Sequence, residues 1–517
     1  MKLRAPVFLC CSILTLRAAE LKVPLPEAPL RLIIPDPKAL DAALSGSYRR
    51  FLEGKPRAGE PVVAAWRKSR VGSKLEDQWM RFTGTLPLDW TALQSLQPRS
   101  LGLALLDVGN LEAVLVVDTP LAALPIPLPA GEQKNHGGIP YALAVAGAGD
   151  KSKDPDRRMG LAWARKGSQL FIATSERALK LALDEALAGR GVTPALPGLV
   201  SLELDLDRLR KDRYYTREFL FEAGPETGRV RTALRAEHGQ LVELREGGTE
   251  PRGPIPTFTV SGAAACGWEP EGTEFWPAFR RGLLEPIPAP LEAPVPALHA
   301  LPAASKDAPE NHYGTDFTRP KAMASATAFE KGELDAWTAL LTRTPIPSWG
   351  YWIGPDGARR MVFPWPEAQD AAFLEACRAT TARRAGCATA VKVGEITELQ
   401  VGPGLPALAL RRSGAYLWVA ACAANLKEVP APQPDAAVVR WARLDLGAVR
   451  REAGRWARVE GPASPERVRP LSDRVLGLLG WMPATKAISV ERRKTAGGWR
   501  EKVVFSALQP QTGEAAK

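Results

Sequence analysis

The stretch Leu161–Lys180 (LAWARKGSQLFIATSERALK) has a counterpart further along the chain, Leu408–Lys427 (LALRRSGAYLWVAACAANLK). The two align without a gap at an offset of 247. Eight of the 20 aligned positions are identical, and in the first copy these are Leu161, Ala162, Arg165, Gly167, Leu170, Ala173, Leu179 and Lys180. Each copy predicts two strands joined at a glycine turn and followed by a helix. A repeat that keeps its register over about 250 residues predicts two structurally equivalent modules.

Two further matches extend the repeat on either side of this stretch. At an offset of 248, a strand–turn–strand pattern recurs, with Gly102, Gly109 and Val114 matching Gly350, Gly357 and Val362. At an offset of 240, the end of a strand recurs, with Leu204-Asp205-Leu206 and Arg210 matching Leu444-Asp445-Leu446 and Arg450. The repeat therefore predicts tandem copies of a whole module.

The chain of 517 residues is too long for a single hydrophobic core. The repeat predicts a first module over residues 20–250 and a second over 251–508, with a Pro/Ala-rich insertion at 286–309 and a disordered tail at 509–517. Successive hairpins and alternating strands predict an α+β fold. Each module is expected to be a mostly antiparallel sheet with helices packed on one face, and the second to close with a hairpin over 488–505.

The charge of the chain favours an ordinary solvated surface. The formal net charge is +11, from 68 basic and 57 acidic residues. The basic residues are scattered, and the longest basic run is Arg492-Arg493-Lys494. A nucleic-acid-binding protein concentrates basic residues on one face. We therefore expect no nucleic-acid partner, and at most peripheral contact with a membrane.

The N-terminus resembles a secretory signal peptide over residues 1–19. Lys2 and Arg4 precede an apolar stretch from Ala5 to Leu16, and Ala18 and Ala19 offer small residues for cleavage. Twelve apolar residues are too few to span a bilayer, which takes about 20. An uncleaved anchor and a misassigned start remain alternatives. Export predicts a periplasmic or extracellular protein.

Removal of the signal would leave four cysteines, all in the second module: Cys266, Cys377, Cys387 and Cys422. An exported chain permits disulfides. Cys377 and Cys387 bracket what looks like a short Arg- and Thr-rich loop and are candidates for pairing. Buried free thiols are the alternative. The chain has no C-x-x-C motif, which argues against a redox or zinc site.

The four histidines do not have the spacing of metal ligands. The densest group of possible ligands is Glu310, His312 and Asp316, in a segment that we expect to be a solvated loop. His136 and His238 lie in turn signatures. We predict no metal site.

Motifs for catalysis and for cofactor binding are also missing. The sequence has no G-x-S-x-G. Gly147-Ala148-Gly149 follows a strand but is not followed by the helix that a dinucleotide site needs. Glu203, Asp205 and Asp207 alternate along a predicted strand and could share a face for acid–base chemistry. A solvent face ending at Asp207 as a helix N-cap is the preferred interpretation. Catalytic residues remain unknown, and no cofactor is expected.

Tryptophan is frequent in the first half of the second module, at Trp268, Trp276, Trp337, Trp349, Trp352 and Trp365. Core packing is the default interpretation, and an aromatic groove for an apolar ligand or a carbohydrate is the alternative.

The strand, turn and helix passage AWARKGSQLFIATSERALKLAL and the hairpin after LGLLGW resemble a bacterial family, the domain of unknown function 3352 (DUF3352). The resemblance covers most of residues 25–508. It implies an exported bacterial protein with no assigned activity, and it supplies no catalytic residues.

Three functional hypotheses remain. The preferred one is a non-enzymatic binding or scaffold component of the cell envelope, whose partner is an unidentified envelope protein. The second is a carrier of a lipid or another apolar ligand. The third is a hydrolase with an unrecognised site near Asp205 and Asp445, or near His312.

Overall fold

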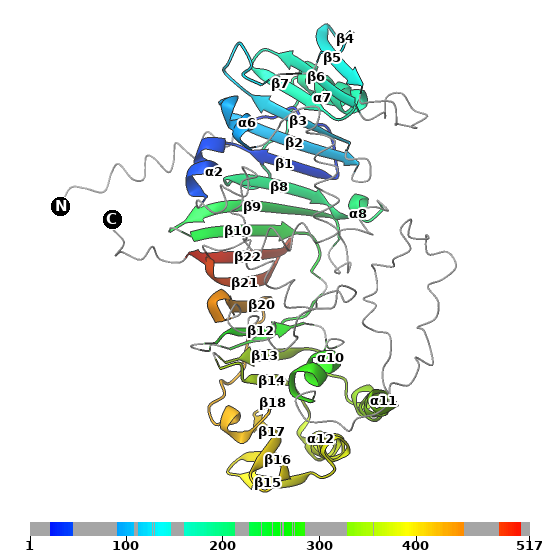
Figure 1. Cartoon of the computed structure of the whole chain (residues 1–517), viewed down its shortest axis with the longest axis vertical. Helices are drawn as coiled ribbons and strands as arrows, with labels where there is room; N and C mark the ends of the chain where they lie inside the picture. Colours follow the sequence, from blue (N-terminus) through cyan, green and yellow to red (C-terminus); the bar gives the residue numbers. More distant parts are fainter. Residues whose placement is uncertain are drawn as a thin grey trace, which may run out of the picture. The chain divides into compact units, whose positions relative to one another are not determined.

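The structure is a computed structural model of the whole chain (Figure 1). It describes residues 21–44, 90–107, 112–126, 128, 130–145, 160–211, 227–238, 240–250, 252–258, 260, 263–270, 272, 275–284, 328–354, 356–448 and 485–507. The signal region 1–19, the insertion 286–309, the tail 509–517, the glycines at 147–149 and the group at 310–316 all lie outside this description. None of the described helices is both long and apolar enough to span a bilayer.

The chain divides into two compact units. Described residues of unit 1 lie within 21–250, 485–488 and 495–507, and those of unit 2 lie within 252–448 and 489–494. Strand β21 (Thr485–Thr495) therefore has residues in each unit. The expected α+β composition is confirmed, because helices accompany sheet that is mostly antiparallel.

The sheet of unit 1 is antiparallel at every described pairing. Its strands lie side by side in the order β4 (Glu132–His136), β5 (Ile139–Val145), β6 (Gly160–Lys166), β7 (Gln169–Ala173), β3 (Glu112–Asp118), β2 (Ser100–Asp107), β1 (Leu30–Ile34), β8 (Val200–Asp205), β9 (Arg229–Glu237), β10 (Gln240–Gly247) and β22 (Gly498–Ala507).

The sheet of unit 2 is also antiparallel. Its order is β15 (Thr389–Val393), β16 (Ile396–Gly402), β17 (Leu405–Ser413), β18 (Tyr416–Ala420), β14 (Arg359–Pro364), β13 (Trp349–Ile353), β12 (Ala265–Glu269) and β20 (Val438–Asp445). A separate two-stranded sheet pairs β11 (Pro256–Thr257) with β19 (Gln433–Pro434).

Helices pack on both faces of the sheet in unit 1. Helix α7 (Glu176–Leu187) buries Leu179 and Leu183 in a cluster that contains Phe171 of β7. Helices α2 (Pro37–Ala43) and α6 (Trp90–Ser95) pack in a second cluster with Leu170 and Ile172. Adjacent residues of a strand point to opposite faces. The expectation of helices on one face is therefore wrong for this unit.

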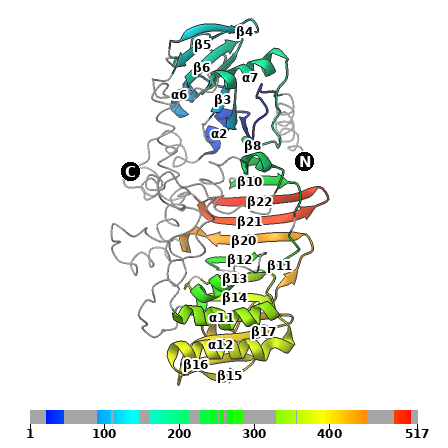
Figure 2. The same cartoon turned by 90° about the vertical axis from the view of Figure 1, so that its right-hand side faces the viewer.

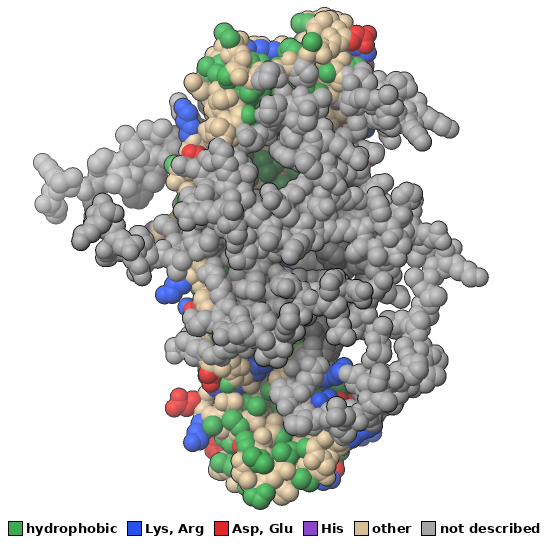
Figure 3. Space-filling view, in the orientation of Figure 1, with side chains coloured by type: hydrophobic (Ala, Val, Ile, Leu, Met, Phe, Trp, Pro, Cys, Tyr) green, Lys and Arg blue, Asp and Glu red, His purple; other side chains and the backbone are tan. Residues whose placement is uncertain are grey.

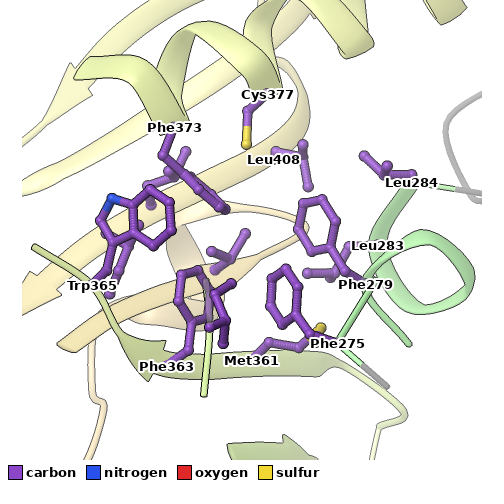
Figure 4. Packing of buried hydrophobic residues seen from close by; sticks show 14 of the residues in the cluster. Phe275, Phe279, Leu283, Leu284, Met361, Phe363, Trp365, Phe373, Cys377 and Leu408 are labelled. Carbon is purple, nitrogen blue, oxygen red and sulfur yellow. The ribbon is translucent and has the colours of Figure 1, made fainter. Parts of the chain in front are cut away.

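Unit 2 carries most of its helices on one face, which Figure 2 views from the front. They are α10 (Phe275–Phe279), the π-helical turn η3 (Arg280–Leu284), α11 (Ala328–Arg343), the 3₁₀ turn η5 (Glu367–Gln369) and α12 (Asp370–Ala385). Phe373 and Cys377 of α12 point into the same cluster as Phe363 and Leu408 of the sheet (Figure 4). The other face carries the short 3₁₀ helix η6 (Ala423–Leu426).

A buried ion pair joins α11 to α12 on this helical face. Nε and Nη2 of Arg384 lie 2.5 and 2.6 Å from the two carboxylate oxygens of Glu333. Nη1 donates to the carbonyl of Leu284 at 2.9 Å. Both side chains are almost fully buried. A bidentate pair of this kind satisfies two charges that would be costly to bury separately.

The last described strand, β22, belongs to unit 1. The sequence assigned the closing hairpin to the second module, but β22 pairs with β10 from Leu241 opposite Phe505 to Gly247 opposite Trp499. Arg245 lies directly opposite the buried Glu501, and their side chains meet at 3.0 Å. This pairing spans more than 250 residues of sequence, so local patterns could not indicate it.

Arg165 and Arg412, an identical pair in the repeat, hold corresponding connections in place. Arg165 donates to the carbonyls of Leu121 and Ala122, which follow β3. Arg412 donates to the carbonyl of Trp365, which follows β14, and to the carboxylate of Asp370. Each arginine fixes the first residues of the chain where it leaves the sheet.

Candidate interaction surface

The most unusual surface of the described residues is at strand β15. All five of its residues are exposed, and among the described strands it pairs only with β16. Val391 is 36% exposed and Val393 is 40% exposed. Alternate residues of a strand share a face, so these two valines form one apolar patch. Figure 3 shows apolar side chains gathered over the end of unit 2 that carries β15, β16 and β17.

A row of directly opposed residues defines the face on which these valines lie. Val393 lies opposite Ile396, Ile396 opposite Arg411, and Arg411 opposite Trp418. Ile396 and Trp418 are buried in the cluster that also holds Leu426 of η6. The valines therefore continue the apolar face of the sheet outward to its edge, beyond the part that η6 covers.

The helix η6 on this face is shorter than α7. Arg411 lies across the end of this helix, where Nη1 donates to the carbonyls of Leu426 and Lys427 at 2.8 and 2.6 Å. Its Nη2 donates to Glu395 at 3.2 Å. Pro430 follows four residues after Leu426. Proline lacks a backbone N–H and restricts the residue before it, so a helix cannot run through this point without disruption.

The corresponding row in unit 1 is covered by a helix. There Lys134 lies opposite Tyr141, Tyr141 opposite Ala164, and Ala164 opposite Phe171. Helix α7 packs on this face over three turns, capped by Ser175, whose hydroxyl accepts from the N–H of Ala178 at 3.0 Å.

Two side chains of β4 bind α7 directly. Lys134 Nζ lies 3.3 Å from Glu176, and His136 Nε2 lies 2.7 Å from Asp184. The end of α7 also approaches the tip of the hairpin, since a Cβ at Gly137 would lie 2.4 Å from Leu187 Cδ1. The edge strand of unit 1 is thus closed on this face by polar side-chain contacts to α7.

Glu176, at the start of α7, has three side-chain partners. Its carboxylate accepts from the Tyr141 hydroxyl and lies 3.0 Å from Lys180 Nζ and 3.3 Å from Lys134 Nζ. Burial disfavours the carboxylate, but the hydrogen bonds from Tyr141 and Lys180 outweigh it, so the pKa of Glu176 is lowered. Desolvation lowers the pKa of Lys134, but its hydrogen bond to Glu176 and the charges of Glu176 and Glu132 raise this pKa overall.

The acidic residues singled out in the sequence have structural roles. Glu203 lies 2.6 Å from Arg31 and 3.2 Å from Arg229. Asp205 is the N-cap of helix α8 (Leu206–Leu209), and its carboxylate accepts from the N–H of Arg208 at 3.0 Å. The expectation that Asp207 is the cap is wrong, because β8 ends at Asp205 and Asp207 is already helical.

Asp445 repeats the contacts of Asp205. Its carboxylate accepts from the N–H of Ala448 at 2.9 Å, as Asp205 does three residues along. The backbone N–H groups of Asp205 and Asp445 donate at 2.8 Å to the carbonyls of Pro29 and Ala264. Each of the two carboxylates thus accepts a hydrogen bond from the backbone, which gives both aspartates a structural role.

The described histidines lie where the turn signatures indicate. His136 ends β4, and His238 has a φ of 51° at the turn after β9. Within the described residues, no group of three or more His, Cys, Asp or Glu side chains could hold a metal ion.

The four cysteines after the signal region are free thiols. Cys377, proposed as a partner for Cys387, is buried in α12, and burial raises its pKa. Cys387 is exposed and lies 3.1 Å from the Val401 carbonyl. The Arg- and Thr-rich segment between them is not a loop, because α12 continues to Ala385.

The tryptophans of unit 2 pack mainly in its core. The fully or nearly buried rings are Trp268, Trp337, Trp349, Trp365 and Trp418. Trp337 contacts Phe279 and Phe373 edge to face, and its N–H donates to Thr380 at 2.9 Å. Trp276 and Trp352 are partly buried beside these clusters.

No family model matches the sequence, and no curated protein matches it. Two solved structures, crystal forms III and IV of TP0453, are similar at 9% identity. The alignments cover 44% and 45% of this chain and 79% and 83% of the respective TP0453 chains, with TM-scores of 0.21 and 0.22. A likeness this weak carries no argument, and the resemblance to DUF3352 stays a prediction.

Sequence reasoning missed β15 and its valines. The signal that could have found them is the alternation of Val391, Lys392 and Val393 directly before Gly394, which is typical of a strand that ends at a turn.

Proposed function

We propose that this protein is a non-enzymatic binding or scaffold component of the bacterial cell envelope. The observation that carries the proposal is the pair Val391 and Val393, exposed side by side on an edge strand. Edge strands are usually protected by charges, prolines or cover. An apolar patch left open at such a position is typical of an interaction site.

We further propose that the two units are related modules of one repeat. Their strand orders support this. The order β4-β5-β6-β7-β3-β2-β1-β8 in unit 1 corresponds, strand by strand, to β15-β16-β17-β18-β14-β13-β12-β20 in unit 2. The register agrees as well, because Ala162 opposite Ala173 corresponds to Ala409 opposite Ala420 at the offset of 247. The caps Asp205 and Asp445 occupy matching positions.

Export and membership of DUF3352 belong to the same proposal. They rest on residues 1–19 and on the passages quoted above. Intact mass and N-terminal sequencing of protein purified from the periplasm and from the medium test export. We expect cleavage after Ala18 or Ala19, and recovery of the uncleaved chain from the cytoplasm would contradict it.

The binding role is tested by crosslinking in cells, affinity capture from envelope fractions and mass spectrometry of the retained proteins. We expect a reproducible partner that is lost from the double variant Val391→Asp/Val393→Asp. Lys392→Asp is the matched control, because Lys392 is exposed in the same strand but points to the face opposite the two valines. A partner set unchanged by the double variant, or a turnover abolished by one point mutation, would contradict the proposal.

A further inference from the structure

We infer that strand β15 pairs with the β15 of a second copy of this chain, antiparallel and related by a two-fold axis at Val391. The inference rests on the proposed binding role and names the partner at this edge. Strand β15 lies at the end of the sheet of unit 2 (Figure 1), and all five of its residues are exposed. Among the described strands only β16 pairs with it, so its other edge is open.

The turn after β15 decides which backbone groups face the open edge. Val393 lies opposite Ile396, and only Gly394 and Glu395 separate them. Gly394 has a φ of 64°, whereas the φ of Glu395 is not positive, which is the pattern of a type II′ turn with glycine first. In a two-residue hairpin of this kind, the pair next to the turn exchanges both backbone hydrogen bonds. The N–H and C=O of Val393 therefore point to β16.

The alternation of the ladder then assigns the other backbone groups of β15. Hydrogen-bonded pairs alternate with non-hydrogen-bonded pairs along two antiparallel strands. Counted back from Val393, Val391 and Thr389 also bond to β16, whereas the N–H and C=O groups of Lys392 and Ala390 point to the open edge. These two residues offer two donors and two acceptors to a further strand.

A second β15 matches these groups in one register. With the two-fold axis at Val391, Ala390 of each copy lies opposite Lys392 of the other, so every outward N–H and C=O gains a partner. Val391 lies opposite Val391 of the second copy, and Thr389 lies opposite Val393. All five residues are then paired, the valines of both copies gather on one face, and no like charges are directly opposed.

The neighbouring registers fit less well. A slide by two residues in one direction places Lys392 opposite Lys392 of the second copy, and directly opposed like charges are destabilising. A slide in the other direction places Lys392 opposite Ala388, which lies outside β15. The register with Val391 on the axis is therefore the one that uses the whole strand without charge repulsion.

The edge strand of unit 1 does not suit the same pairing. The middle residue of β4 is Lys134, which would meet Lys134 of a second copy across the axis. Its side chain is also held by Glu176 of α7. The pairing is thus specific to β15. A five-residue strand is small beside the about 800 Å² per partner that stable interfaces bury, so we expect a weak, reversible dimer.

Cysteine trapping on the full-length protein tests the register. Val391 faces its own copy in a non-hydrogen-bonded pair, where the Cα atoms lie about 4.5 Å apart and a disulfide can form. Val391→Cys should therefore give a disulfide-linked dimer on a non-reducing gel. All variants carry Cys387→Ser, because Cys387 is an exposed thiol.

The matched controls are Ala390→Cys and Lys392→Cys. Each lies diagonally across from its own copy, about 7–8 Å away, which is beyond the reach of a disulfide. Each should stay monomeric alone, and an equal mixture of the two should crosslink. No dimer from Val391→Cys, or equal yields from all three variants, overturns the inference.

A charge swap on the axis separates a lost contact from a lost fold. Analytical ultracentrifugation of the unaltered chain should show dimers that increase with concentration. Val391→Asp and Val391→Lys each oppose like charges and should weaken the dimer about fivefold or more. A mixture of the two should regain it, because opposite charges then meet, and misfolded protein could not do so. Lys392→Asp should leave the dimer unchanged, since it faces Ala390. A chain that stays monomeric, or no recovery in the mixture, overturns the inference.

Capture from envelope fractions distinguishes this inference from the proposed function. If the chain is monomeric but capture still depends on Val391 and Val393, the binding role stands and the paired copy falls. If the chain dimerises through β15 but capture retains no other protein, the paired copy stands and the role in the envelope falls.

Discussion

The edge strands β4 and β15 occupy corresponding places in the two units, yet one is covered and the other is bare. Strand β4 presents Lys134 and His136 to acidic residues of α7, whereas β15 presents Val391 and Val393 to solvent. The pairings correspond, but the side chains differ, since Val393 stands where unit 1 has Lys134. Pro430 and the Arg411 contacts end η6 where α7 continues. The closed edge of unit 1 thus combines polar side chains on β4 with a longer helix, and β15 and η6 have neither.

On the opposite face of the sheet, it is unit 2 that carries the long helix. After β3, unit 1 runs through the proline-punctuated segment 120–131 to β4, whereas unit 2 inserts η5 and α12 between β14 and β15. Helix α12 then packs Phe373 and Cys377 on the sheet and pairs with α11 through Arg384. Each unit therefore keeps a long helix at the β4 or β15 end of its sheet, but on different faces.

The largest expected effect comes from breaking the buried ion pair between Glu333 and Arg384 in unit 2. Arg384→Met leaves Glu333 buried without its partner and should lower the free energy of unfolding of unit 2 by about 3–5 kcal/mol. Hydrogen exchange should show the loss in α11 and α12, with β4 to β7 unchanged. The matched control is Glu333→Leu/Arg384→Met, which removes both charges and should be nearly neutral. Equal losses in the two variants would contradict this account.

The corresponding leucines under the two helices give the next effect. Leu179→Ala and Leu426→Ala should each cost about 2–5 kcal/mol, since both side chains are fully buried. Only Leu179→Ala should speed hydrogen exchange at its edge strand, because α7 covers β4 and η6 does not reach over β15. Equal acceleration at β4 and β15 would show that the two edges are protected alike.

Tyr141→Phe should reveal a pH dependence that unit 2 lacks. The Tyr141 hydroxyl helps to lower the pKa of Glu176 below its ordinary value of 4.5. A lowered carboxyl pKa stabilises the fold above the unfolded value, and this stabilisation is lost as the pH falls through the folded value. The variant should lose about 1.5–3 kcal/mol at pH 7, and less as the pH falls below about 4.

Denaturant unfolding across this pH range measures the difference. The matched control is Ile396→Val, at the position in unit 2 that corresponds to Tyr141, where no pH-dependent difference is expected. A loss for Tyr141→Phe that is the same at pH 7 and pH 3.5 would mean that the hydrogen bond does not act through the charge of Glu176.

The smallest effect concerns the two aspartates that the units share. Asp205→Ala and Asp445→Ala each remove a carboxylate that accepts from a backbone N–H three residues along. Each should cost about 1 kcal/mol, with faster exchange confined to Arg208 and Ala448. Asp207→Asn is the control for unit 1. A cost well above 2 kcal/mol for either aspartate would indicate a role beyond capping.

Local signals in the sequence predicted many of the elements correctly. Asp36-Pro37 begins α2 as expected, with the Asp36 carboxylate accepting from Lys38 and Ala39. Ser175 caps α7, and Gly189 follows its end at a φ of 63°. Caps and glycine turns are set by neighbouring residues, so the local sequence is enough to predict them.

Helix α12 was missed because its buried face is not apolar. The buried positions 373, 377, 380, 381 and 384 have helical spacing, but Thr380, Thr381 and Arg384 occupy three of them. A search for apolar periodicity passes over such a helix. Strand β15 was missed with it, and the candidate surface therefore could not be predicted. The pairing of β22 with β10 was missed because it depends on residues far apart in the chain.

The contacts of Arg165 and Arg412 have a practical consequence for engineering. The guanidinium of Arg165 holds the chain where it leaves β3, and that of Arg412 holds it where it leaves β14. The segment that follows can therefore differ in length and content while the strands keep their register. The connection after β3 is thus a natural place to insert a fluorescent reporter domain. Such a fusion would let the protein be followed in living cells with the surface over β15 left unaltered.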